Sequence, residues 1–173
     1  SQAQENDVKV ALDMLGQSPV GCFYIVDSYG SIYPEQMTRI CDMYLEAAEK
    51  YGKKVGIHAH NNQQLAFANT IEACGCGVDY LDATYSGMGR GAGNCYIESL
   101  IGFLHNPKYN IFPVIQFIEN YINPLKADGV TWGYDMQYLF TGLLNRHPKS
   151  AIEYTKEGRT DLTELYNEII LMD

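Results

Sequence analysis

The stretch KVGIHAHNN, residues 54–62, joins a short apolar run to a polar end. Residues 54–59 are short, apolar and rich in β formers, which predicts a buried strand. A helix is expected from about 62 to 74, and two glycines end it. A strand followed by a helix is the repeating unit of parallel α/β proteins, so this stretch decides the fold class.

Two more units of this kind flank the stretch. Upstream, residues 8–15 predict a helix, CFYIVD at 22–27 predicts a strand, and a helix is expected from about 35 to 51. Downstream, VDYLDAT at 78–84 predicts a third strand, with a helix from about 95 to 105. Three consecutive units predict parallel strands joined by right-handed crossovers.

The pattern changes after Pro107. Helices are predicted for residues 112–123, about 135–146 and 161–171, separated by prolines and glycines. This second half is either a helical appendage or the outer helices of a larger body.

Composition excludes several classes of protein. The 173 residues, 46% of them hydrophobic, are enough for one domain with a core. A formal charge of −9 disfavours nucleic acid as a partner, and no apolar run is long enough to cross a membrane. The five cysteines are odd in number and form no CxxC pair. Free thiols in a reducing compartment are the simplest interpretation, and with no visible signal peptide they predict a cytoplasmic protein.

His58 and His60 are the strongest candidates for chemistry. Residues two apart in a strand face the same side, here near its carboxyl end, where parallel α/β proteins bind ligands. Two imidazoles there can share a metal ion. The alternative is a hydrogen-bonded pair with a structural role. If they bind a metal, protons should compete for the imidazoles below about pH 6.

Polar residues at the other strand ends leave two interpretations open. Asp27 and Ser28 follow the first strand and could orient substrate or cap a turn. Asn61 and Asn62 could cap the next helix or support the histidines by hydrogen bonds. Asn94 could be a weak oxygen ligand or the N-cap of the helix that follows.

The segment SGMGRGAGN, residues 86–94, contains the pattern GxGxxA, but Tyr85 and Ser86 separate its first glycine from the apolar strand. No strand with a terminal acid follows about twenty residues later, so a dinucleotide site is disfavoured. Gly89 and Arg90 could bind an anion through backbone N–H groups and the guanidinium. The alternatives are a mobile lid or a bend that needs positive φ.

Taken together, VDSYG (26–30), residues 56–84 and SGMGRGAGNCYIE (86–98) resemble the metal-dependent aldolase and acyl-CoA lyase or synthase superfamily of TIM barrels. Within it the similarity is strongest to the 4-hydroxy-2-oxovalerate aldolases, with a weaker similarity at 133–144. The resemblance implies an α/β fold, the C-terminal part of a (β/α)8 barrel. Residues 1–110 would hold strands six to eight, and residues 111–173 a C-terminal helical region.

The resemblance also implies a reaction, the cleavage of a 4-hydroxy-2-oxo acid into pyruvate and an aldehyde. His58 and His60 would be metal ligands, and Asn94 a nearby or ligating amide. Tyr138, in GYDMQY, would be catalytic at the hydroxyl end of the substrate. Asp27, Ser28, Asn62, Gly89 and Arg90 are the candidate substrate-binding residues. The expected cofactor is Mn²⁺, with Mg²⁺ or Zn²⁺ as alternatives.

The chain departs from the family in one respect. The family takes an Asp ligand, a catalytic arginine and a base histidine from the first strand of the barrel, and no matching motif is found here. We therefore expect the N-terminal half of the barrel, from a longer polypeptide or a partner, to be required for activity. The resemblance further implies a homo-oligomer and an aldehyde dehydrogenase partner. The alternatives are an acyl-CoA lyase, a synthase of the 2-isopropylmalate or homocitrate type, or a non-catalytic barrel module.

Overall fold

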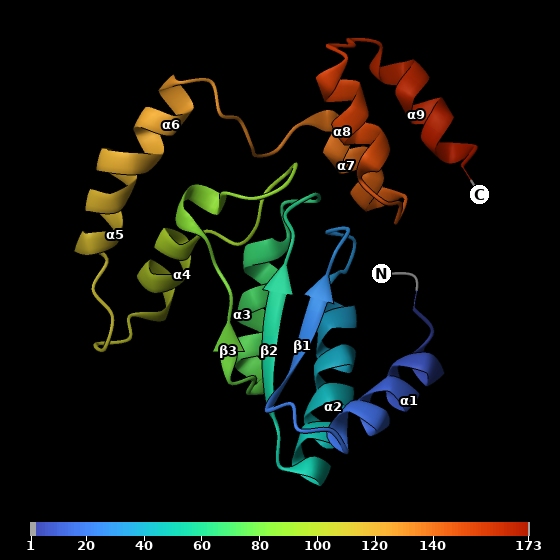
Figure 1. Ribbon diagram of the computed structural model, residues 1–173, viewed down its shortest axis with the longest axis vertical. Helices are drawn as coiled ribbons and strands as arrows, with labels where there is room; N and C mark the ends of the chain where they lie inside the picture. The colour runs from blue at the N-terminus through green and yellow to red at the C-terminus, as the bar shows by residue number, and fades with distance from the viewer. Residues whose placement is uncertain (1–2, 173) are drawn as a thin grey trace.

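The computed structural model describes residues 3–172 and contains one parallel sheet (Figure 1). The sheet is made of β1 (Cys22–Asp27), β2 (Lys54–Ala59) and β3 (Tyr80–Leu81), in the order β1-β2-β3. The predicted bounds of the first two strands are confirmed. The third is shorter than predicted, although the N–H groups of Asp79 and Asp82 still donate to β2 carbonyls.

One helix precedes β1 and a helix follows each strand, as the alternating pattern predicts. They are α1 (Glu5–Gly16), α2 (Pro34–Tyr51), α3 (Ala66–Cys76) and α4 (Ile97–Leu104). Pro34 sits in the first turn of α2, and Gly52 ends that helix with a φ of 64°. Helix α3 begins later than predicted because residues 61–64 form a turn, in which the N–H of Gln64 donates to the carbonyl of Asn61.

The two faces of the sheet differ in burial. Phe23 and Ile25 point into the core with apolar residues of α2 and α3. These helices cover that face in Figure 1. On the other face Tyr24, Val26 and Tyr80 are 40%, 43% and 49% exposed. Parallel sheets are normally covered on both sides, so this open face is the one that would point into a barrel.

The residues after α4 form two groups of helices. The first is a continuous arm beside α4, made of α5 (Phe112–Phe117), the π-helix η2 (Ile118–Ile122) and α6 (Asn123–Ala127). The second is α7 (Met136–Leu143), α8 (Lys149–Lys156) and α9 (Leu162–Ile170). Helix α8 was not predicted. The π-helix ends at Ile122, two residues before Pro124 in the first turn of α6.

Helix α7 lies over the carboxyl ends of the strands (Figure 1). The Asn62 amide nitrogen donates to the Tyr138 carbonyl at 3.3 Å and to Thr141 Oγ1 at 3.1 Å. Ser31 donates to the Asn145 amide oxygen at 2.8 Å. The second group of helices is therefore tied directly to the strand ends.

The cysteines Cys22, Cys41, Cys74, Cys76 and Cys95 are free thiols, as expected. Within residues 3–172, no helix combines the length and the apolar character needed to cross a membrane.

Candidate metal centre

The structure brings His58 and His60 together at the carboxyl end of β2. Their ring centroids are 5.1 Å apart, and the rings meet edge to face at 78°. Both side chains are partly buried. Strand alternation explains the arrangement, since both side chains leave β2 on the open face of the sheet. The two imidazoles therefore lie on the same side of the sheet, as the strand period predicts.

Burial keeps His60 neutral. The pKa of its imidazole is lowered to about 4, first by burial and then by the charges of His58 and Arg90. A neutral ring keeps a nitrogen lone pair that can bind a metal. Proton competition for His60 therefore begins at a lower pH than the value of about 6 expected from an ordinary imidazole.

Acid should destabilise the fold through His60. Its folded pKa of about 4 lies below the ordinary 6.5, so between these values the unfolded chain binds a proton that the folded chain does not. The free energy of unfolding therefore falls as pH falls through this range, and the loss is complete below about pH 4. Urea unfolding in EDTA at several pH values measures it. His60→Gln should show a smaller pH dependence, and an equal slope in both proteins contradicts the assignment.

Asn94 is paired with His60 in an isolated antiparallel bridge. Its amide nitrogen donates to the Met88 carbonyl at 3.2 Å, whereas its amide oxygen is buried without a hydrogen-bond partner. Helix α4 begins at Ile97, so the N-cap alternative for Asn94 is wrong. A buried acceptor without a donor is costly, and a cation would satisfy it.

These residues fit a divalent cation as part of a ligand set. Two imidazole nitrogens and an amide oxygen are donors suited to Mn²⁺ or Mg²⁺ more than to a thiolate zinc site. Within residues 3–172, no three His, Cys, Asp or Glu side chains cluster to hold a metal ion. The described residues would therefore supply only part of a coordination sphere, and both the metal and its ligands stay predictions.

Asp27 is turned into the loop that follows β1. Its fully buried carboxylate accepts hydrogen bonds from the N–H groups of Ser31 at 3.0 Å and Ile32 at 3.2 Å. Burial raises the pKa of this carboxyl, and the backbone hydrogen bonds oppose the rise. These contacts are those expected if Asp27 caps the turn after β1. The Ser28 carbonyl accepts from the Arg90 guanidinium at 3.5 Å. The substrate roles of Asp27 and Ser28 stay predictions.

The glycine-rich loop is a tightly folded bend. Gly87, Gly91 and Gly93 have φ values of 64°, 60° and 81°. A Cβ on Gly93 would lie 2.1 Å from the Gly87 carbonyl oxygen, and one on Gly89 would lie 2.5 Å from the Asn94 amide nitrogen. The absence of a side chain at Gly89 thus makes room for Asn94. The loop has the positive φ values of the bend described above, while anion binding by Gly89 and Arg90 stays a prediction.

The asparagines and Tyr138 hold the loops together. The Asn61 amide oxygen accepts from the N–H of Ala66, the first residue of α3. The N-cap position of α3 is Leu65, so neither asparagine is the N-cap of that helix. Asn62 binds α7 instead. Tyr138 is buried, packs against Gly91, and has its hydroxyl 3.4 Å from Thr155 Oγ1. The roles of Asn62 and Tyr138 toward substrate are untested.

Sequence reasoning missed Asp82 and Tyr24. Asp82 Oδ2 lies 3.2 Å from His58 Nδ1, and the Tyr24 hydroxyl donates to Asp82 Oδ1 at 3.2 Å. Part of the signal was present, because Asp82 lies near the carboxyl end of the predicted third strand, residues 78–84. Without the strand register, its contact with His58 could not be assigned.

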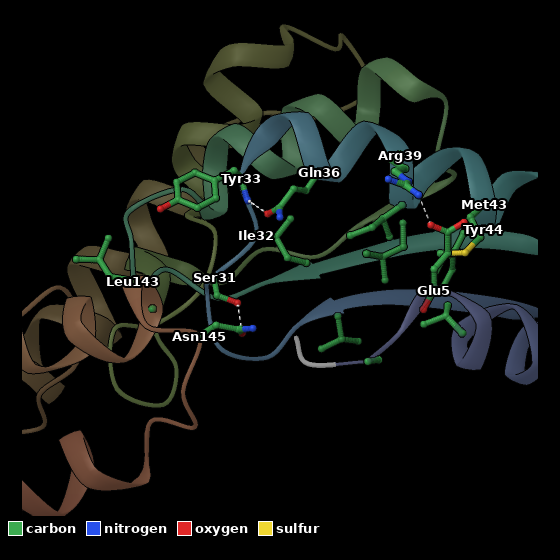
Figure 2. Close-up of a pocket in the computed structure, with 16 residues that line it drawn as sticks. Glu5, Ser31, Ile32, Tyr33, Gln36, Arg39, Met43, Tyr44, Leu143 and Asn145 are labelled. Atoms are coloured by element: carbon green, nitrogen blue, oxygen red, sulfur yellow. Dashed lines mark hydrogen bonds and ion pairs between the residues drawn. The ribbon is translucent and has the colours of Figure 1, made fainter. Parts of the chain in front are cut away.

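A cavity of about 460 Å³ lies along β1 (Figure 2), and neither His58 nor His60 lines it. Ile25 and Val26 line it, together with the Glu5–Arg39 ion pair. In the described part of the chain no strand pairs with the outer edge of β1, because β1 is the first strand in the sheet order. The cavity therefore marks an open sheet edge, distinct from the metal centre.

Comparison with known proteins gives consistent findings. The family model described as HMGL-like matches residues 1–120. Oxaloacetate decarboxylase from Mycobacterium tuberculosis is 46% identical over 81 residues, covering 47% of this chain and 23% of that protein. A 4-hydroxy-2-oxovalerate aldolase from Thermus thermophilus is 40% identical over 122 residues, covering 64% and 35%. The chain thus spans less than half of these relatives.

A solved structure supports the fold. The N-terminal domain of a proposed aldolase from Bacteroides vulgatus superposes with a TM-score of 0.67 at 34% identity. The match covers 79% of this chain and 45% of that one. The predicted fold class, consecutive strand–helix units of a TIM barrel, is confirmed, as is the similarity to the aldolases.

Proposed function

This chain belongs to the HMGL-like family, and from that premise we propose that it forms the C-terminal part of a divalent-metal-dependent aldolase. The proposed reaction cleaves a 4-hydroxy-2-oxo acid into pyruvate and an aldehyde. The observation that carries the proposal is the joint placement of His58, His60 and the unpartnered oxygen of Asn94 at the carboxyl end of the sheet.

The described residues have separable tasks in this proposal. His58, His60 and Asn94 would hold the cation, which supplies a Lewis acid for the 2-oxo group when bound. Arg90 is exposed, and no carboxylate in residues 3–172 forms a salt bridge with it. It is therefore available to bind the carboxylate of the substrate.

The rest of the barrel is part of the proposal. Cleavage of the C3–C4 bond needs a base for the proton of the 4-hydroxyl, and we assign that base to the N-terminal half. The open edge of β1 and its cavity leave space for a neighbouring strand. Tyr24, Val26 and Tyr80 would then face the barrel interior. We propose that this chain alone is inactive.

A second candidate is decarboxylation of oxaloacetate. The observation that favours it is the 46% identity to oxaloacetate decarboxylase over 81 residues. Both reactions break the C3–C4 bond of a 2-oxo acid and leave the enolate of pyruvate. They differ in the second product, which is carbon dioxide in one case and an aldehyde in the other. The same residues would therefore serve either substrate.

Thioester chemistry has less support. An acyl-CoA lyase or synthase on this scaffold would be expected to use a reactive cysteine near the loop. The nearest is Cys95, which is fully buried, and burial raises the pKa of its thiol. A buried, protonated thiol is a weak nucleophile. A non-catalytic module would require that the metal centre bind nothing.

The test uses the complete protein that contains this chain. With Mn²⁺, we expect pyruvate to be released from 4-hydroxy-2-oxo acids together with one equivalent of aldehyde, and EDTA should abolish the release. Pyruvate and aldehyde are measured with coupled dehydrogenases, and carbon dioxide is measured from oxaloacetate. Carbon dioxide without aldehyde supports the decarboxylase instead. No turnover of any 2-oxo acid overturns the proposal.

A further inference from the structure

Asp82 lies on the same face of the sheet as His58. Gly56 of β2 pairs with Tyr80 of β3, and the Asp82 N–H continues the ladder by donating to the Ile57 carbonyl at 3.0 Å. His58 and Asp82 each lie two residues beyond that pair, so they are lateral neighbours on the open face. The parallel register therefore brings an acid beside the first histidine.

Both carboxylate oxygens of Asp82 are engaged. Oδ2 lies 3.2 Å from His58 Nδ1, and Oδ1 accepts from the Tyr24 hydroxyl at 3.2 Å. The Tyr24 ring lies over Gly56, where a Cβ would come within 2.5 Å of the ring. Tyr24 comes from β1, His58 from β2 and Asp82 from the residue directly after β3, and the carboxylate is held from two sides.

This contact selects one tautomer of His58. A carboxylate is an acceptor, so the proton of the neutral ring is held on Nδ1 and the lone pair remains on Nε2. Nε2 is then the nitrogen available to a cation. Within residues 3–172, no trio of His, Cys, Asp or Glu is placed to hold a metal, so the geometry does not group Asp82 with the two histidines as a third ligand.

We propose that Asp82 is a positioning residue that fixes the ring and the tautomer of His58 so that Nε2 faces the cation, with Tyr24 fixing Asp82 in turn. This inference rests on the proposed metal-dependent function. The competing explanation is an ordinary surface ion pair, since the side chains of His58 and Asp82 are 30% and 44% exposed. Such a pair would contribute little and would not affect metal binding.

The experiment compares Mn²⁺ affinity, measured by electron paramagnetic resonance, in the complete protein and its Asp82→Asn variant. Partners of metal-binding histidines typically change affinity 10–100-fold, so a loss of roughly that size is expected. Asp42→Asn, which removes the same charge from an exposed site on α2, should leave the affinity unchanged. An unchanged affinity in Asp82→Asn overturns the proposal.

A second readout needs no metal. The ¹⁵N chemical shifts of the His58 ring in EDTA should show the proton on Nδ1 in the wild type and a mixture of tautomers in Asp82→Asn. If that variant does not fold, Tyr24→Phe removes only the hydroxyl and should weaken Mn²⁺ binding by about threefold. Wild-type tautomer populations and affinity in Tyr24→Phe would then overturn the proposal. A wild type that binds no Mn²⁺ overturns the proposed function, whereas the tautomer readout still decides whether Asp82 holds the ring.

Discussion

The His58→Ala and His60→Ala variants of the complete protein are expected to bind Mn²⁺ more than about 100-fold more weakly than the wild type and to lose aldolase turnover. Each change removes one of two imidazoles whose centroids lie 5.1 Å apart. The remaining ring and the Asn94 oxygen cannot replace the lost nitrogen. Metal content after dialysis and Mn²⁺ titration provide the measurement.

A matched control separates metal ligation from a general loss of histidine. His105 is exposed at the end of α4 with a φ of 47°, a conformation that asparagine tolerates. His105→Asn should therefore keep wild-type metal content and turnover. If His58→Ala and the wild type carry equal metal, the ligand assignment is wrong, whatever the activity of the protein.

Gly93→Ala is expected to destabilise the fold by roughly 3–5 kcal/mol, which is larger than most single substitutions. The new Cβ would lie 2.1 Å from the Gly87 carbonyl oxygen, which is backbone and cannot rotate away. A φ of 81° adds strain for any residue with a side chain. The Gly93 carbonyl also accepts from the Asn61 N–H at 2.9 Å, so the shift would spread to the turn after β2. The midpoint of urea unfolding measures the loss.

Gly75→Ala is the matched control for this experiment. Gly75 lies inside α3, and a Cβ there meets no atom within 4 Å. Alanine is the better helix former by about 1 kcal/mol, so this variant should be as stable as the wild type or more so. Equal midpoints for Gly93→Ala and Gly75→Ala would show that the loop is not the tight bend described here.

The sequence predicted those parts of the fold that depend on local pattern. The bounds of β1 and β2 follow from short apolar runs between turn residues. Helix α8 is only eight residues long, and its few apolar residues, among them Ala151 and Tyr154, pack within the last group of helices, so its stability depends on tertiary contacts. The shortened third strand likewise depends on pairing with neighbours and not on propensity.

The candidate site was likewise predictable only where it depends on local pattern. The period of a strand placed His58 and His60 on one face, but the role of Asn94 was left open between ligand and N-cap. Asp82 escaped notice because its contact with His58 depends on the register between β2 and β3. The sequence also left open where the Asp27 carboxylate points, and the structure shows it capping the loop after β1.

The packing of Tyr24 over Gly56 has an evolutionary consequence. The tyrosine occupies the volume that any side chain at position 56 would need. Homologues with a larger residue at 56 should therefore either carry a smaller residue at 24 or turn the ring at 24 away from the sheet. Either change removes the phenol from Asp82, so the acid at 82 should vary more freely in the same lineages.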